Sequence, residues 1–270
     1  MDTLTASHLS SLKKLRADTG EENLSAFPAK TIAAMDARYI FNSTRNVLTM
    51  LRKLYPDNKV FLTEMQSRRE AFKKLDNAQE PTESQLKKYI PWDDIITFRN
   101  DYQAGMTPDE QLLISLYTMV PPARADYTPM KIVNRKPSKL EAGTNYLVLR
   151  NKTAHFLFHA FKTHATIGDQ YLLVPPDLNK VIREYLAAHP GQTYLLEYGG
   201  KPWTEARLSV AVKRIFQRYL DIDTGITMLR HSYITKLRAG EKSIAENTKI
   251  ANAMMHSIST SQAYRFLSLE

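Results

Sequence analysis

A polar stretch near residue 80 does most to limit how this chain can fold. Residues 76–88 hold few apolar side chains and include Pro81, which interrupts helix geometry. Apolar residues recur at helical spacing on both sides of the stretch. The 270 residues also exceed the usual size of one hydrophobic core. We therefore predict two domains, residues 1–82 and 88–270, joined by a linker at 83–87.

The N-terminal domain is predicted to be helical and basic. Asn42-Ser43-Thr44 offers N-caps for a segment with an apolar face that includes Leu48 and Leu51, and a further helix is predicted from about Thr63 to Leu75. With a net charge of +9, these faces favour a polyanionic partner, although a solvated helix face is the alternative for each. The basic side chains are Arg45, Arg52, Lys53, Arg68, Arg69, Lys73 and Lys74.

The second domain is predicted to be mainly α with a small β-sheet. Thr107-Pro108-Asp109-Glu110 is a strong helix start, and the helix must end before Pro121-Pro122. Residues 146–149 and 156–158 flank a polar turn and predict a hairpin, with another strand at 170–174. Further helices are predicted at 177–188, 204–220, 227–238 and 243–255, and a short last helix is predicted to carry Tyr264.

Several classes of protein are excluded by composition. The chain has no cysteine, which excludes disulfides, thiolate metal sites and cysteine nucleophiles. It shows no signal-peptide core and no apolar run long enough to cross a bilayer, so we expect an intracellular protein with no membrane partner. His155-x-x-x-His159 lacks the glutamate of a zinc-protease helix, and packing is the better interpretation.

Five residues form an ordered set suited to phosphodiester chemistry without a metal: Arg124, Lys162, Arg230, His256 and Tyr264. An arginine fork grips phosphate oxygens, and a histidine donates a hydrogen bond or a proton to the same group. A tyrosine oxygen is a nucleophile that can hold a cut strand covalently. The whole ordered set is far less expected by chance than any one member.

This order, with its contexts, resembles the tyrosine recombinase (phage-integrase-type) superfamily. The matching pieces are Pro121-Pro122-Ala123-Arg124, a lysine beyond a hairpin, Leu229-Arg230-His231-Ser232, and His256 followed eight residues on by Tyr264. The first box is most similar to members from viruses and mobile elements. The resemblance implies a helical DNA-binding domain before a catalytic domain.

The resemblance also implies a role for each residue. Tyr264 would attack the scissile phosphate and form a 3′-phosphotyrosyl link, Arg124 and Arg230 would clamp the phosphoryl oxygens, and Lys162 would protonate the leaving 5′-oxygen. His256 would hydrogen-bond the phosphate or orient Tyr264. It further implies double-stranded DNA as the partner, self-association on DNA as a dimer or tetramer, no metal or cofactor, and a place in the nucleus or cytoplasm of a host cell.

One departure and two rival functions stay open. Thr227 stands where the family pattern has a histidine, which leaves the proton transfer for Tyr264 unassigned, and Lys152 in the hairpin turn competes with Lys162. His231 does not replace the missing histidine, because its position on a helix turns it about 100° from Arg230. The rival functions are DNA relaxation of the type IB topoisomerase kind and DNA binding without catalysis.

Overall fold

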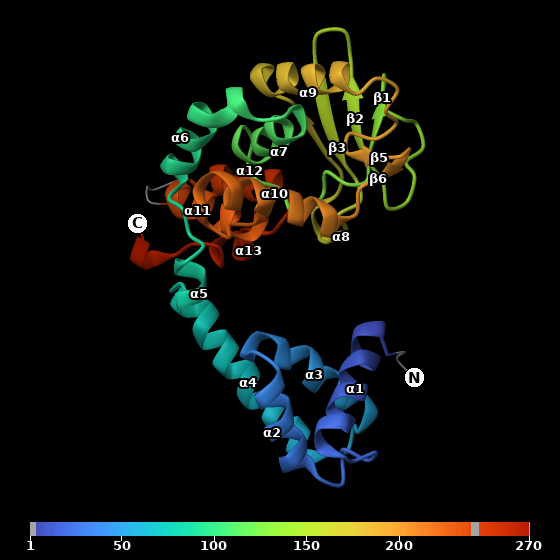
Figure 1. The fold of residues 1–270 in the computed structure, drawn as a ribbon, viewed down its shortest axis with the longest axis vertical. Helices are drawn as coiled ribbons and strands as arrows, with labels where there is room; N and C mark the ends of the chain where they lie inside the picture. The colour runs from blue at the N-terminus through green and yellow to red at the C-terminus, as the bar shows by residue number, and fades with distance from the viewer. Residues whose placement is uncertain (1–3, 239–242, 270) are drawn as a thin grey trace. The chain divides into compact units, whose positions relative to one another are not determined.

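The computed structural model describes residues 4–238 and 243–269 (Figure 1). The chain divides into two compact units, and the division falls between Ala78 and Gln79. A short helix, α5 (Glu83–Leu86), occupies the predicted linker at 83–87 and belongs to the second unit. It forms there because Thr82 and Gln85 make a capping box, a local signal within the polar stretch.

The first unit is helical. It consists of α1 (Ala6–Thr19), α2 (Pro28–Arg38), α3 (Phe41–Leu54) and α4 (Lys59–Ala78). Leu48 and Leu51 are fully buried, as the apolar face of α3 predicts. The predicted N-caps at 42–44 are wrong, because α3 already begins at Phe41 and Ile40 is its N-cap residue.

One predicted DNA-facing side chain of the first unit has a structural role instead. Arg68 on α4 is largely buried, and its guanidinium donates to Asp36 at 2.7 Å and to Glu64 at 2.5 Å. This pairing ties α4 to α2. Arg69, Lys73 and Lys74 on the same helix are exposed.

The second unit is mainly helical. Its capped helix α7 (Pro108–Thr118) begins and ends where the sequence predicts, with the Thr107–Glu110 capping box formed. The last predicted helix is wrong in one respect, because that helix, α13 (Ile258–Gln262), ends before Tyr264, which follows it in a turn. The remaining helices are α6 (Trp92–Tyr102), α8 (His164–Ile167), α9 (Pro176–Ala188), α10 (Glu205–Leu220), α11 (Ile226–Arg238) and α12 (Ile244–Ala253), with 3₁₀ turns η1 (Gln103–Gly105) and η2 (Leu267–Leu269).

A four-stranded sheet completes the second unit, in the order β1 (Met130–Val133), β2 (Asn145–Leu149), β3 (Ala154–Phe158) and β4 (Gln170–Leu173). Strands β2 and β3 form the predicted hairpin, whereas β1 was not predicted and pairs with β2 in parallel. A separate two-stranded ribbon joins β5 (Glu197–Tyr198) and β6 (Lys201–Pro202). The predicted class, mainly α with a small sheet, is confirmed.

The parallel pairing decides which loops meet. Because β1 and β2 run the same way, the segment that leads into β1 lies at the start of β2. The antiparallel β3 returns to that end, so the β3–β4 connection at 159–169 also lies there. The β2–β3 turn lies at the opposite end of the sheet.

None of the described helices has both the length and the apolar content needed to cross a membrane.

A buried asparagine holds the segments at this end together. The Asn145 side chain, 1% exposed, donates to the backbone carbonyls of Asp126 at 2.7 Å and Ala160 at 3.1 Å. Its Oδ1 accepts from the backbone N–H groups of His159 at 2.8 Å and Ala160 at 2.7 Å. One side chain thus joins the start of β2 to the segments before β1 and after β3.

We predict that Asn145→Ala lowers the free energy of unfolding by about 2–4 kcal/mol, because it leaves several backbone groups without partners. The measurement is chemical denaturation followed by circular dichroism. Asn151→Ala, at an exposed position in the β2–β3 turn, is the control and should change stability by no more than about 0.5 kcal/mol. Equal losses in the two variants would contradict this role for Asn145.

Candidate active site

The candidate site is built around Arg230, which lies on α11 and is 1% exposed. Its Nη1 donates to the carbonyl of Pro122 at 2.7 Å, and both terminal nitrogens lie 3.3 Å from the carbonyl of Met254. Its Nε has no hydrogen-bond partner among the described residues. Arg230 therefore ties α11 to the segment after α7 and to the end of α12.

The charge of Arg230 is buried without an ion pair among the described residues, and the buried Asp126 carboxyl acts on it from beyond ion-pair distance. None of the described carboxylates lies within ion-pair distance of its guanidinium. Burial lowers the pKa of Arg230 from its ordinary value, and the nearby Tyr264 opposes that effect. A buried cation normally has an anionic partner, so the burial of this guanidinium with carbonyl partners and no ion pair is unusual.

Tyr264 lies directly against that guanidinium. Its ring centroid is 4.8 Å from the Arg230 guanidinium carbon, a cation–π distance. The same ring stacks on His256 at 5.5 Å and contacts His231 at 4.9 Å between centroids. The nucleophile predicted from the sequence therefore lies beside the predicted arginine and histidine.

His256 follows a sharp change of backbone direction. Met255 takes a left-handed conformation with φ of 52°, and His256 is buried just beyond it. Its Nδ1 lies 3.2 Å from the Ser257 carbonyl, which can only accept, so Nδ1 carries the proton. The other nitrogen, Nε2, is buried, has no partner among the residues that the structure describes, and is left as an acceptor. Burial and the charge of Arg230 lower the pKa of His256 to about 4.

His231 belongs to the site, which the sequence did not suggest. Its Nδ1 donates to the Tyr264 backbone carbonyl at 2.8 Å, and its ring stacks on Phe266 at 4.2 Å. Burial lowers the pKa of His231 to about 4. It therefore holds the backbone of the tyrosine segment. Only the return of residues 264–266 onto α11 reveals this contact.

Arg124 and Lys162 line one cavity of about 520 Å³ at the end of the sheet described above. Both side chains are exposed. The Arg124 backbone N–H donates to Asp126 at 3.0 Å, and Pro122, two residues earlier, accepts from Arg230. Thr163, next to Lys162, donates to the Met255 carbonyl at 2.7 Å. Arg124 and Lys162 are thus connected through their neighbours to Arg230 and His256.

The two competing residues lie elsewhere. Lys152 lies in the β2–β3 turn, at the end of the sheet opposite to Arg124 and Lys162. Thr227 is exposed one turn before Arg230 and lines a different hollow with Lys88 and Lys213. The topology therefore favours Lys162 and leaves Thr227 outside the contacts of Tyr264.

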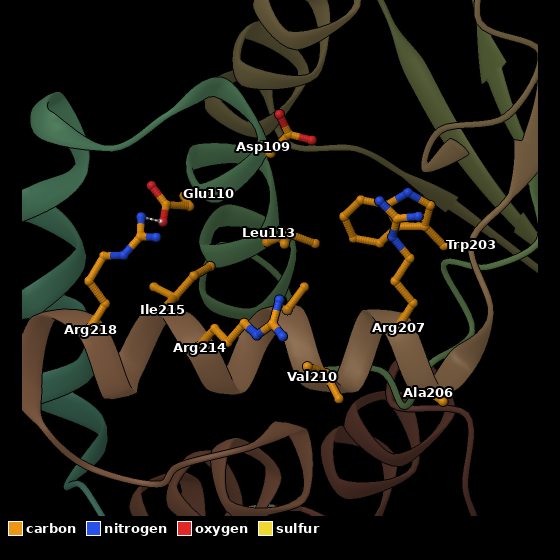
Figure 2. A pocket seen from close by; sticks show the side chains of 11 residues that line it. Asp109, Glu110, Leu113, Trp203, Ala206, Arg207, Val210, Arg214, Ile215 and Arg218 are labelled. Carbon is orange, nitrogen blue, oxygen red and sulfur yellow. Dashed lines mark hydrogen bonds and ion pairs between the residues drawn. The ribbon is translucent and has the colours of Figure 1, made fainter. Parts of the chain in front are cut away.

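A further hollow lies between α10 and α7, and contacts within the protein engage charged side chains that line it. Figure 2 shows Arg207, Arg214 and Arg218 projecting from α10 into it. Arg218 pairs with Glu110 at 2.6 Å, and the guanidinium of Arg207 lies 4.6 Å from the ring of Trp203. Two of the three arginines are therefore engaged in packing α10, and none of the five predicted residues lines the hollow.

Comparisons with known proteins give structural matches only. No protein-family model and no curated protein matches the chain. The structure of XerA recombinase is similar at 14% identity with a TM-score of 0.48, covering 97% of this chain and 86% of that one. XerH site-specific recombinase bound to difH substrate is similar at 16% identity with a TM-score of 0.44, covering 97% and 87%.

The two buried histidines predict an acid-sensitive second unit. Each has a pKa of about 4 in the folded chain and therefore stays neutral until the pH falls near that value. An unfolded histidine instead binds a proton below a pH of about 6.5. The contribution of the two neutral histidines to the free energy of unfolding is therefore fully present above the pKa of an unfolded histidine, and it is lost as the pH drops from 6.5 to 4. The expected loss is on the order of 3 kcal/mol for each histidine.

Denaturation at pH 7 and at pH 4.5 measures this loss. His231→Gln and His256→Gln should each reduce the difference between the two pH values. An unaltered difference in both cluster variants would contradict the assignment.

Proposed function

We propose that this chain is a DNA strand transferase of the tyrosine recombinase type, which cuts and rejoins DNA through a 3′-phosphotyrosyl intermediate at Tyr264. The observation that carries the proposal is the buried Arg230 guanidinium. It lacks a carboxylate partner among the described residues and lies 4.8 Å from the ring of a tyrosine. A phosphodiester supplies the missing anion and places its phosphorus where the tyrosine oxygen can reach it.

The first chemical step follows from the residues around that phosphate. The Tyr264 oxygen attacks phosphorus, and the bond from phosphorus to the 5′-oxygen breaks. Arg230 and Arg124 stabilise the charge that develops on the nonbridging oxygens. Lys162, in the cavity shared with Arg124, gives a proton to the leaving 5′-oxygen. A 5′-hydroxyl from another strand then attacks the phosphotyrosine and restores Tyr264, so the bond energy is conserved.

His256 takes the proton of Tyr264 in this scheme. Its ring stacks on the tyrosine, and its Nε2, which has no partner within the described part of the chain, is an acceptor, because Nδ1 holds the proton shared with Ser257. Thr227 is exposed and has a hydroxyl that cannot act as a base near neutral pH. His256 thus fills the role that the family pattern gives to the position of Thr227.

The wider context follows from the same proposal. Duplex DNA is the partner, held mainly through phosphates by a chain of net charge +9, so binding weakens with salt. The helical first unit is the DNA-binding domain, and the chain self-associates on paired sites to exchange strands. We place it in the nucleus or cytoplasm of a host cell, where DNA is available, and we infer from the Pro121-Pro122-Ala123-Arg124 box that it serves a virus or mobile element.

A suicide-substrate experiment tests the chemistry. The protein is incubated with a pool of nicked duplexes of randomised sequence, denatured, and assayed for DNA that stays covalently attached. We expect attached DNA joined through Tyr264 and no attachment with Tyr264→Phe. Tyr233→Phe is the matched control, because Tyr233 packs on Trp92 with 4.9 Å between ring centroids, and it should retain the adduct.

Two outcomes would reject parts of the proposal. DNA bound without any adduct would leave a DNA-binding protein without catalysis. An adduct that survives Tyr264→Phe would remove the nucleophile assignment. If an adduct forms, relaxation of a supercoiled plasmid that lacks paired sites would instead indicate the topoisomerase type of activity.

The proton assignment predicts a contrast between two variants. His256→Gln keeps a hydrogen-bonding group but cannot accept a proton, so adduct formation should slow by roughly 10²–10⁴-fold at pH 7. Thr227→Ala should change the rate by no more than about 2-fold, as expected for an exposed side chain outside the reaction. Equal rates in the two variants, measured by single-turnover adduct formation, would contradict the role of His256.

A further inference from the structure

The β3–β4 connection brings together three side chains that the strand-transfer chemistry does not use. His159 follows β3, His164 begins α8, and Asp169 precedes β4. One ligand atom from each lies within 4.8 Å of the others. The pattern His155-x-x-x-His159 in the sequence points to a different pair, but the His155 ring stacks on Tyr171 at 4.5 Å and takes no part in this cluster.

The backbone fixes where the three side chains meet. The His159 N–H is held by Asn145, and the antiparallel register pairs Phe158 with Gln170, which brings residues 159 and 169 together. Gly168, with φ of +73°, turns the chain from α8 back into β4. His164 packs edge-on against Phe161, with 5.5 Å between ring centroids. The cluster is therefore held on both sides by regular structure.

The three side chains are close enough together to bind one metal ion. His159 Nδ1 and His164 Nε2 both lie 2.7 Å from the same carboxylate oxygen, Oδ1 of Asp169. Zn²⁺ binds histidine nitrogens and carboxylate oxygens at about 2.0–2.2 Å and accepts three protein ligands with one open position. The Asp169 side chain is 40% exposed, so it can turn to let an ion enter.

The cavity beside the cluster supplies the fourth coordination position and indicates a role for the ion. His159 and His164 line the cavity that also contains Arg124 and Lys162, so a fourth position faces that cavity, where water can complete the shell. Lys162 and Thr163 lie between the two histidines in the chain, and Thr163 reaches the Met255 carbonyl. An ion bound by His159 and His164 closes a loop of chain that includes Lys162.

We propose that His159, His164 and Asp169 form a Zn²⁺ site that orders the β3–β4 connection and positions Lys162. Water completes the coordination shell, and strand transfer needs no bond to the ion. The inference does not depend on the proposed function, because the three ligands can hold an ion whether or not the chain cuts DNA.

Metal binding tests the site directly. The full chain is stripped with a chelator and dialysed against Zn²⁺ alone, and bound metal is counted per chain. We expect one Zn²⁺ per chain, and roughly 10–100-fold weaker binding in Asp169→Asn and in His164→Gln. His155→Gln, at a histidine on the same sheet but outside the cluster, is the matched control and should bind as the wild type does. Circular dichroism of each variant checks that the fold is kept.

Hydrogen exchange tests the role of the ion. Zn²⁺ should slow exchange of the backbone amides in residues 159–170 of the wild type and not in Asp169→Asn. Binding that is equal in all variants, or no binding, would overturn the site; binding without slower exchange would overturn its ordering role. The DNA adduct assay is independent, since a chain that binds zinc and forms no adduct would reject strand transfer and keep the site.

Discussion

The structure of the second unit depends on one desolvated cation. The Arg230 guanidinium is bound to the carbonyls of Pro122 and Met254, so it joins α11 to the segment that carries Arg124 and to the end of α12. Carbonyl dipoles and the Tyr264 ring offset only part of the cost of burying a full charge. The charge of Arg230 is thus only partly compensated at the place where three segments meet.

The second constraint is the parallel pairing of β1 with β2. It sends the β2–β3 turn away from Arg124 and brings the β3–β4 connection toward it. If β1 had paired with β2 in the antiparallel direction, the β2–β3 turn with Lys152 would lie at the same end of the sheet as Arg124. The choice between Lys152 and Lys162 is therefore a matter of topology, and Asn145 stabilises the result by hydrogen-bonding both segments.

Features set by local chemistry were predictable from the sequence, and features set by distant contacts were not. The Thr107–Glu110 capping box and the β2–β3 hairpin depend on neighbouring residues and were predicted correctly. Strand β1 was missed because its pairing with β2 crosses a long loop. The role of His231 was missed because a helical wheel gives its direction from Arg230 and does not show that Tyr264 returns above it. For Arg68 the sequence offered DNA contact or a solvated helix face and not its ion pair, because its partner Asp36 lies on another helix.

Desolvation links the charge of the site to its proton transfer. The burial that strengthens the field of Arg230 also keeps His256 neutral, with a pKa of about 4. In the free chain this imidazole is a weak base, too weak to take a proton from a phenol. A phosphodiester held by Arg230 brings negative charge beside His256 and partly cancels the arginine charge, and both changes raise its pKa. In the proposed mechanism His256 therefore becomes an effective base only when DNA occupies the site, which couples activation of Tyr264 to substrate binding.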